Sequence, residues 1–248
     1  MTFLFPDWPA PSCVRSLSTL RGGGASAAPY HGASPADGGL NLALHVGDDV
    51  RAVAQNRALL KERLPSAPLW LNQVHGTQVA TDEVADGAPS ADACVTRARG
   101  RVCVVLTADC LPVLFCDTAG SVVAAAHAGW RGLAGGILEE TVSALRRAGA
   151  GELLAWLGPA IGPARFEVGE PVARVFAAKD SALQQAFRHT AGDKYLADIY
   201  LLARLILAKQ GVVRVSACGR CTVSEPDCFY SYRRDGATGR MGSCIWLE

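Results

Sequence analysis

Short apolar runs bounded by turn residues fill the centre of the chain. The runs WLNQV, QVATD, ADACVT, RVCVVLT, PVLFCD and SVVAAAH, between residues 69 and 127, are predicted to be strands. Gly, Pro, Asp or Asn flanks each of them, which is typical of positions where strands end. Asp109 and Cys110 interrupt the hydrophobic run of residues 104–114 in its middle. A buried strand gains nothing from this polar pair, so it marks a candidate functional position.

Apolar residues at helical spacing occur on both sides of this strand-rich centre. The predicted helices are residues 50–64, 133–150, 171–189 and 193–211. Further strands are predicted over residues 152–158 and 212–219, and the chain ends on the apolar sequence CIWLE. Strands followed by helices in this way predict one α/β domain that spans residues 1–248.

Residues 20–40 are rich in Gly, Ala, Ser and Pro, which predicts a flexible loop. Apolar segments flank this loop closely, so it belongs to the domain and does not link two domains. Its RGGG sequence matches neither the dinucleotide-binding fingerprint nor a Walker loop. We therefore expect at most a mobile lid, in which Arg21 could meet an anionic substrate.

Composition narrows the class of protein. The 248 residues carry a net charge of +1 with both signs mixed along the chain, which argues against a nucleic-acid binder and favours a small-molecule partner. The N-terminus lacks a basic leader, and no uncharged apolar stretch of about 18 residues follows, so we expect a cytoplasmic protein without a membrane span. Nine cysteines, an odd number, lie mostly in apolar runs and are predicted to be reduced.

Three possible metal ligands lie where apolar runs give way to turn residues: His75, Cys110 and His127. A zinc ion with three protein ligands keeps a fourth position for water, whose pKa then falls to roughly 7. The alternative needs no metal, because His127 could activate Cys110 as a nucleophile in a thiolate–imidazolium pair. The separations of the three residues match no short metal-binding signature, so the residues alone leave both interpretations open.

Longer blocks resemble a known family. NQVHG, ADACVT, TADCLPVLFCD, AAHAGWRGLAGGI, LGPAIGPARFEVG and FYSYRRDGATGRMGSCIWL are similar to signature blocks of the YfiH family, also labelled DUF152, laccase-domain or multicopper polyphenol oxidase proteins. The resemblance extends from residue 40 to the C-terminus. It implies a single α/β domain with stacked α/β/β/α layers. It also implies a zinc or copper site whose ligands are His75, Cys110 and His127.

The family resemblance implies a metal-dependent purine nucleoside phosphorylase, which splits adenosine or inosine with phosphate into base and ribose 1-phosphate. Methylthioadenosine cleavage and adenosine deamination are further implied activities. The alternatives are a copper-dependent polyphenol oxidase, a hydrolase or amidase that edits peptidoglycan precursors, and a metal-binding protein without catalysis. Five histidines and no H-x-H pair are too few ligands for a multicopper cluster, and the nucleobase deaminase signature is absent.

Several residues are candidates for this chemistry. Asp109 is either an acid–base group or a carboxylate that orients a ligand imidazole. Arg131 is the favoured phosphate ligand, because guanidinium binds phosphate in a bidentate manner and a predicted helix begins just after it. Other candidates for substrate contact are Arg21, Arg233, Arg234, Trp130, Phe229 and Tyr230.

Cys218 and Cys221 form a C-x-x-C motif, with Cys228 and Cys244 downstream. A structural zinc site would need a second pair at matched spacing, which the downstream cysteines do not provide. We therefore expect buried, reduced thiols here.

Overall fold

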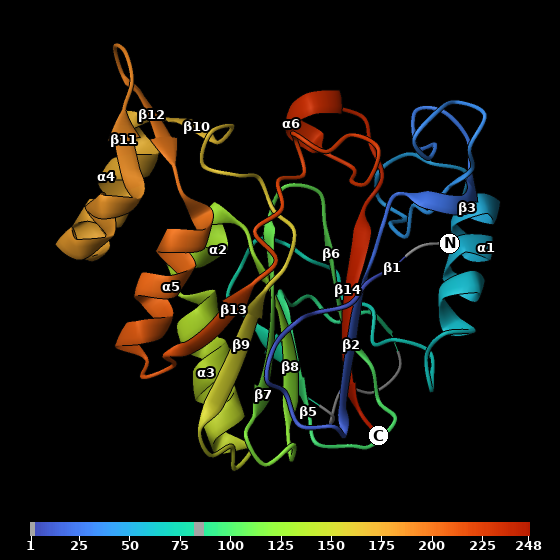
Figure 1. Ribbon diagram of the computed structural model, residues 1–248, viewed down its shortest axis with the longest axis horizontal. Helices are drawn as coiled ribbons and strands as arrows, with labels where there is room; N and C mark the ends of the chain where they lie inside the picture. Colours follow the sequence, from blue (N-terminus) through green and yellow to red (C-terminus); the bar gives the residue numbers. More distant parts are fainter. Residues whose placement is uncertain (1–2, 82–86) are drawn as a thin grey trace.

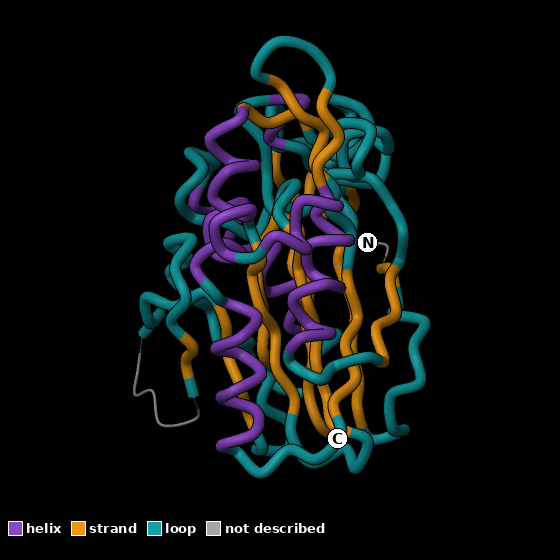
Figure 2. The backbone as a smooth tube through the Cα atoms, turned by 90° about the vertical axis from the view of Figure 1, so that its left-hand side faces the viewer, coloured by secondary structure: helices purple, strands orange, loops and turns teal. Residues whose placement is uncertain are grey.

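The computed structural model describes residues 3–81 and 87–248. Helices and strands form four layers, in the order helix, sheet, sheet, helix (Figure 1). Viewed from the side of the larger helical layer, helices lie in front of the strands (Figure 2). The predicted α/β/β/α architecture is therefore confirmed.

A mixed six-stranded sheet forms one central layer. Its strands, in spatial order, are β13 (Arg214–Ala217), β9 (Leu153–Leu157), β7 (Leu111–Asp117), β8 (Val123–Ala128), β5 (Ala93–Thr96) and β4 (Val79–Ala80). Every residue of β5, β7, β8 and β9 is buried. Both faces of these strands are covered, which explains why they are continuous apolar runs without alternation.

An antiparallel four-stranded sheet packs against the first one. Its strands, in spatial order, are β1 (Phe3–Leu4), β2 (Val14–Thr19), β14 (Met241–Leu247) and β6 (Cys103–Thr107). Trp156 and Leu114 of the larger sheet pack with Ile245 of the smaller one in the core between them. The outer face of the smaller sheet is covered by α1 (Val50–Lys61), through residues such as Leu60.

Three helices cover the other face of the six-stranded sheet: α2 (Trp130–Gly135), α3 (Ile137–Arg147) and α5 (Ile199–Lys209). The apolar face predicted for α3 is buried, but the predicted helix of residues 133–150 is divided. Gly136 separates α2 from α3 with a φ of 108°, a left-handed conformation that glycine adopts without strain.

Both C-terminal helix predictions extend too far. The observed elements are α4 (Glu170–Lys179), a 3₁₀ turn η1 (Ser181–Ala186), and a sheet of β10 (Glu167–Gly169), β12 (Lys194–Ala197) and β11 (Phe187–His189). Asp180 ends α4 with an extended backbone and caps the following 3₁₀ turn. Asp198 accepts a hydrogen bond from the Leu201 backbone and starts α5 only after β12.

Two central strand predictions are also too long. Residues 70–74 form no regular strand: Asn72 makes an isolated bridge to Ser90, and Leu69, just before this run, makes one to Cys103. In the run 78–82 only β4 is regular, and residue 82 lies outside the described residues.

The glycine-rich segment 20–40 contains β3 (Gly22–Ser26). The buried Asn56 amide of α1 accepts a hydrogen bond from the Ala25 backbone and donates one to the Gly39 carbonyl. The segment is therefore attached to the helix that covers the smaller sheet.

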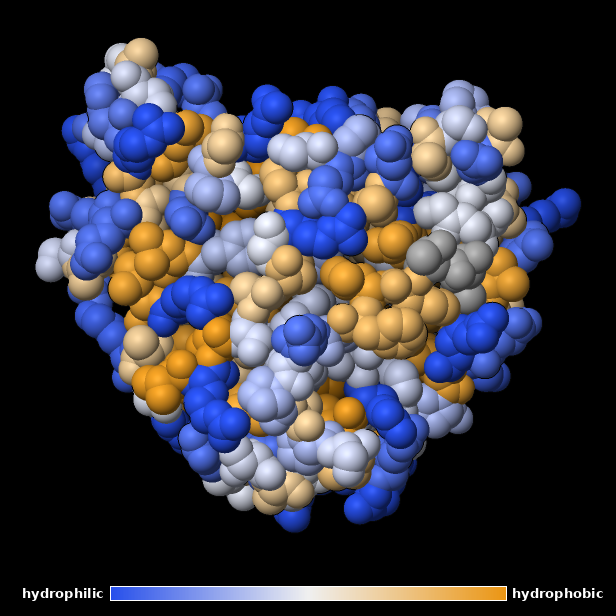
Figure 3. All heavy atoms as spheres, viewed as in Figure 1, coloured by the Kyte–Doolittle hydropathy of each residue, from blue (hydrophilic) through white to orange (hydrophobic). Residues whose placement is uncertain are grey.

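Hydrophilic residues dominate the tips of the surface in Figure 3, whereas hydrophobic residues gather in patches across the middle of this view. Among the described residues, no helix has the length and apolar character needed to cross a membrane.

Candidate metal centre and active site

The polar pair that interrupts the central hydrophobic run lies at a corner between the two sheets. Strand β6 belongs to the smaller sheet and β7 to the larger one, so the chain crosses from one to the other over residues 108–110. Asp109 has a φ of 85° and His75 a φ of 59°, and these are the only non-glycine residues with positive φ in the described chain. Such conformations cost roughly 1–3 kcal/mol and cluster at functional sites.

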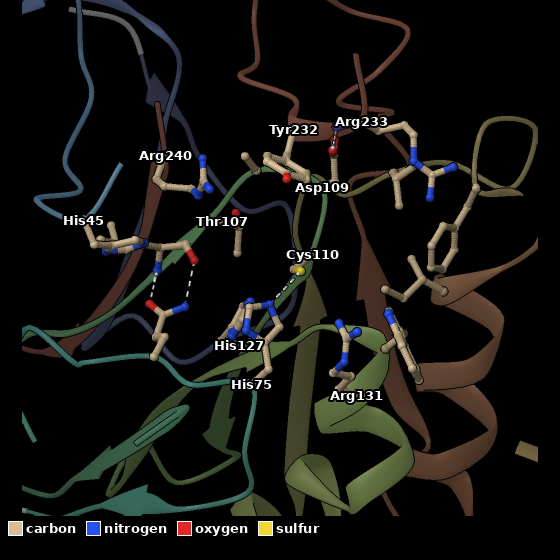
Figure 4. Close-up of a pocket in the computed structure, with 17 residues that line it drawn as sticks. His45, His75, Thr107, Asp109, Cys110, His127, Arg131, Tyr232, Arg233 and Arg240 are labelled. Atoms are coloured by element: carbon tan, nitrogen blue, oxygen red, sulfur yellow. Dashed lines mark hydrogen bonds between the residues drawn. The ribbon is translucent and has the colours of Figure 1, made fainter. Parts of the chain in front are cut away.

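The three predicted ligands converge (Figure 4). The ligand atoms of His75, Cys110 and His127 lie within 4.8 Å of one another, and the Cys110 Sγ is 3.9 Å from the His75 Nε2. Gly129 permits this approach, because a Cβ there would lie 3.0 Å from the Cys110 Sγ. Two imidazoles and a thiol are donors that suit zinc or copper, so the residues fit a single metal ion.

Asp92, which the sequence analysis did not single out, organises this centre. Its fully buried carboxylate accepts hydrogen bonds from the His127 Nδ1 at 2.8 Å, the His75 backbone at 3.0 Å and the Gly76 backbone at 2.7 Å. This hydrogen bond occupies the His127 Nδ1 and leaves Nε2 as the ring nitrogen available to a metal. Asp92 lies in the block ADACVT, but an aspartate just before a strand is also an ordinary turn residue.

Charges at the centre favour a thiolate. Burial alone would raise the pKa of Cys110, but interactions with His127 and His75 outweigh it and lower this pKa to about 6. Burial would lower the pKa of His127, but Cys110 and Asp92 raise it to about 9. Burial opposes ionisation of Asp92 as well, yet the hydrogen bonds from His127 and Gly76 keep its pKa below the ordinary value. The thiol is therefore ionised at neutral pH, which both metal binding and nucleophilic attack require.

A cavity of about 510 Å³ opens above the three ligands. This volume falls in the range of small-molecule sites. Besides the three ligands, the predicted residues that line it are Asp109, Trp130, Arg131 and Arg233. Lining residues that the sequence analysis missed include His45, Gln73, Phe166, Tyr232 and Arg240.

Cations lie on both sides of the metal-ligand cluster in Figure 4, Arg131 and Arg233 on one side and Arg240 on the other. The Arg131 guanidinium lies 4.5 Å from the centre of the Trp130 ring. Burial lowers the pKa of Arg240, while Cys110 and Asp109 act in the opposite direction. Arg240 immediately precedes β14, and nothing in its local sequence distinguishes it from a surface arginine.

Asp109 does not orient an imidazole, so that hypothesis is wrong. Its carboxylate accepts hydrogen bonds from the Thr222 hydroxyl and the Arg233 backbone N–H, both at 2.6 Å. Through these hydrogen bonds Asp109 holds α6 (Tyr232–Asp235) against the crossing at residues 108–110 between the two sheets. The carboxylate that contacts the imidazole is that of Asp92.

Four predicted contact residues do not line this cavity. The buried Arg21 donates to the carbonyls of Pro226 and His31, and Arg234 donates to the carbonyls of Thr222 and Phe229. Phe229 and Tyr230 are completely buried. Since these two arginines and two aromatic rings connect loops inside the protein, we no longer expect them to contact the substrate.

Fold and site together define a class: a layered α/β/β/α protein with a His–Cys–His cluster suited to a metal at the base of a cationic cavity. The family model described as multi-copper polyphenol oxidoreductase laccase matches residues 15–248, and the chain belongs to this family. This family is the laccase-domain family that the sequence blocks indicated.

Several curated relatives carry the name purine nucleoside phosphorylase. The protein of Pseudomonas aeruginosa is 50% identical over 99% of this chain and 98% of its own length. The YfiH protein of Escherichia coli is 51% identical over 98% of each chain. Among solved structures, a DUF152 protein of Neisseria meningitidis matches with a TM-score of 0.91 and 48% identity over the whole of both chains. YlmD of Geobacillus stearothermophilus matches with a TM-score of 0.88 and 29% identity, over 100% of this chain and 97% of its own.

Proposed function

We propose that this protein is a metal-dependent purine nucleoside phosphorylase that cleaves adenosine or inosine with phosphate. The observation that carries the proposal is the cavity, in which a His–Cys–His centre faces three arginines and several aromatic rings. Full-length relatives named purine nucleoside phosphorylase, at 44–51% identity, support the same activity. Methylthioadenosine, a nucleoside of similar size, is a further proposed substrate.

Phosphorolysis requires a site that holds a phosphate dianion next to the sugar. Arg131 is proposed to bind this phosphate, since its guanidinium packs on Trp130 beside the centre. Arg233 and Arg240 add positive charge to the same cavity. This charge stabilises the anion that attacks C1′ of the ribose and favours its binding over that of water.

Aromatic rings provide surfaces for the rest of the nucleoside. Trp130, Phe166 and Tyr232 line the cavity, and such rings stack favourably on purines. Tyr232 is 62% exposed and therefore lies where substrate would enter.

The proposed ligands of the metal are His75, Cys110 and His127, and the proposed ion is zinc, with copper as the alternative. When bound, the ion supplies Lewis-acid polarisation of a substrate atom. Asp92 holds the His127 ring in place, and the low pKa of Cys110 keeps its sulfur available as a ligand.

We place the enzyme in the cytoplasm, with a nucleoside and phosphate as its partners. All nine cysteines are free thiols in the structure, as expected in a reducing compartment.

The alternative activities have less support. Among the described residues, the His–Cys–His cluster is the single group of ligands found to suit a metal, and it has too few donors for a multicopper oxidase. Deamination would require an acid–base carboxylate, and Asp109, the single carboxylate among the described residues that line the cavity, is held by Thr222 and Arg233. No separate observation favours an amidase.

The test is release of hypoxanthine from inosine by purified protein whose metal content has been measured. We expect release only with phosphate, together with ribose 1-phosphate. Equal release without phosphate would identify a hydrolase instead.

Arg131→Ala tests the phosphate site. Loss of charge-assisted hydrogen bonds, worth about 1.5–3 kcal/mol, should raise the KM for phosphate by roughly 10–150-fold and leave the KM for inosine little changed. Arg174→Ala is the control, because Arg174 pairs with Glu170 on the exposed surface of α4. An unchanged phosphate KM in Arg131→Ala would remove Arg131 from the phosphate site.

A further inference from the structure

A second cavity, of about 380 Å³, lies between α5 and the loop that follows β13. It is lined by Cys221, which is half-buried, together with Arg165, Arg204 and Ser224. Cys221 belongs to the C-x-x-C motif, which the phosphorylase proposal does not use. The cavity gives small molecules access to the Cys221 sulfur.

The surroundings of Cys221 favour the thiolate. Its Sγ accepts a hydrogen bond from the Gly162 backbone N–H at 3.2 Å. A Cβ at Gly162 would lie only 3.1 Å from this sulfur, so the absence of a side chain allows the approach. Burial would raise the pKa of Cys221, but the Ser224 hydroxyl and backbone N–H groups of the same turn outweigh it and lower this pKa. Partial exposure and donors directed at sulfur are the conditions under which a cysteine becomes reactive.

Cys218 differs from Cys221 although only a short turn separates them. Burial raises the pKa of Cys218, and its Sγ lies 4.0 Å from the Tyr200 hydroxyl. Gly219, with a φ of 66°, provides the turn between the two cysteines. A thiol with a lowered pKa, three positions in sequence from one with a raised pKa, is the pattern of a peroxide-sensitive cysteine and its resolving partner.

Hydrogen bonds connect this turn to the catalytic cavity. Thr222, directly after Cys221, donates its hydroxyl to the Asp109 carboxylate at 2.6 Å. Tyr200 accepts a hydrogen bond from the Ala160 backbone and lies 2.8 Å from the Arg220 carbonyl. A change in the turn is therefore transmitted to Asp109, the neighbour of the metal ligand Cys110.

We propose that Cys221 is a second reactive site of this protein, a thiol that hydroperoxides oxidise and that Cys218 resolves as a disulfide. The Cys221 thiolate attacks one peroxide oxygen, the O–O bond breaks, and the leaving oxygen takes a proton to give water or an alcohol. Cys221 is then a sulfenic acid. The Cys218 sulfur attacks it, the S–O bond breaks, and water leaves with the Cys218 proton. Two thiols lose two electrons, which the peroxide gains.

The disulfide draws the 218–221 turn together and displaces Thr222 from Asp109. Phosphorolysis therefore decreases severalfold on oxidation and recovers with a dithiol reductant. This inference goes beyond the proposed function, and its first test does not depend on any enzymatic activity.

The first test treats the metal-loaded full-length protein with hydrogen peroxide and maps the modified cysteines by peptide mass spectrometry. Bound metal protects Cys110, so the expected product is a Cys218–Cys221 disulfide. In Cys218→Ser the expected product is a sulfenic acid at Cys221, trapped by dimedone. Cys228→Ser is the matched control, because Cys228 lies in the same loop region and should not alter the product.

Dimedone labelling of another cysteine in place of Cys221, or a disulfide that excludes Cys218, would overturn the proposal. Cys221→Ser should form neither product, and Cys221→Ala serves in its place if the serine variant fails to fold. Activity is then compared before and after oxidation. A Cys218–Cys221 disulfide with unchanged phosphorolysis would contradict the connection through Thr222. Absence of phosphorolysis in the untreated protein would contradict the proposed function alone.

Discussion

The metal-ligand cluster and the Cys218–Cys221 turn both stabilise a thiolate, but their donors differ. At Cys110 the pKa is lowered by two imidazoles, from His75 and His127, which come from separate segments. At Cys221 it is lowered by N–H and O–H groups, most of them from its own turn. Imidazoles also carry lone pairs that bind a cation, whereas N–H groups do not. The first thiolate is therefore suited to a metal and the second to oxidation.

The two regions also differ in how the fold builds them. The metal-ligand cluster lies where the chain passes between two sheets, and Asp109 and His75 hold left-handed conformations there. The Cys218–Cys221 turn obtains its left-handed residue from Gly219, without strain. The surrounding sheets maintain the strained geometry of the first region, whereas the second region needs no such support because its left-handed residue is a glycine.

Cys110→Ala should produce the largest effect. Loss of the thiolate leaves two ligands, so we expect loss of bound metal and of phosphorolysis, with an unchanged far-UV circular dichroism spectrum. Elemental analysis and the inosine assay measure both. Cys221→Ala should keep its metal, and a Cys110→Ala protein with full metal content would show that the sulfur is not a ligand.

Asp92→Asn should weaken metal binding by about 10–100-fold, because the orienting charge beside His127 is lost while the side-chain volume is kept. Competition with a chelator measures the affinity. Glu225→Gln is the matched control, since the Glu225 carboxylate accepts a hydrogen bond from the Cys221 backbone in the second region. Equal affinities of Asp92→Asn and the unmodified protein would contradict the role of Asp92.

Alkylation of metal-free protein by iodoacetamide should distinguish the thiols by pH. The Cys110 rate should increase as pH rises through about 6, where its thiolate forms, and then level off. An ordinary thiol with a pKa of 9.0 reacts more slowly at neutral pH. Cys116, whose pKa burial raises to about 12, should remain unmodified. Added metal should protect Cys110 but not Cys221, and a Cys110 midpoint near pH 9 would contradict the thiolate assignment.

Cys221→Ser under reducing conditions should produce the smallest effect. Its sulfur does not line the catalytic cavity, so kcat/KM for inosine should change by less than about twofold. A large loss without any oxidant would mean that Cys221 supports catalysis directly.

Much of the fold follows from local pattern. The apolar runs of β7, β8 and β9 correctly predicted strands, because a strand buried on both faces is a continuous apolar run. The amphipathic pattern of α3 correctly predicted a helix, because a helix buried on one face has apolar residues at helical spacing. The segment of residues 193–198 was assigned to a helix because its apolar spacing continues into α5. Its strand conformation depends on pairing with β10 and β11, which local spacing does not encode.

The three proposed metal ligands were predicted from their positions at the ends of apolar runs and from family blocks, and the structure brings them together. Asp92 and Arg240 were missed, because an isolated aspartate or arginine has the same local signal at a surface as in a site. Arg21 was expected at the substrate and is instead buried against the carbonyls of Pro226 and His31.

The sequence by itself determined the α/β class, most of the central strands and the presence of imidazole and thiol groups at the ends of apolar runs. Hydrophobicity and donor chemistry are properties of individual residues, so they can be recognised without a structure. The tertiary structure alone decided that β6 and β7 lie in different sheets. That crossing turns Asp109 and Cys110 out of the strand and brings Cys110 to His75 and His127. Convergence of distant residues depends on how sheets pack, and no local pattern records that packing.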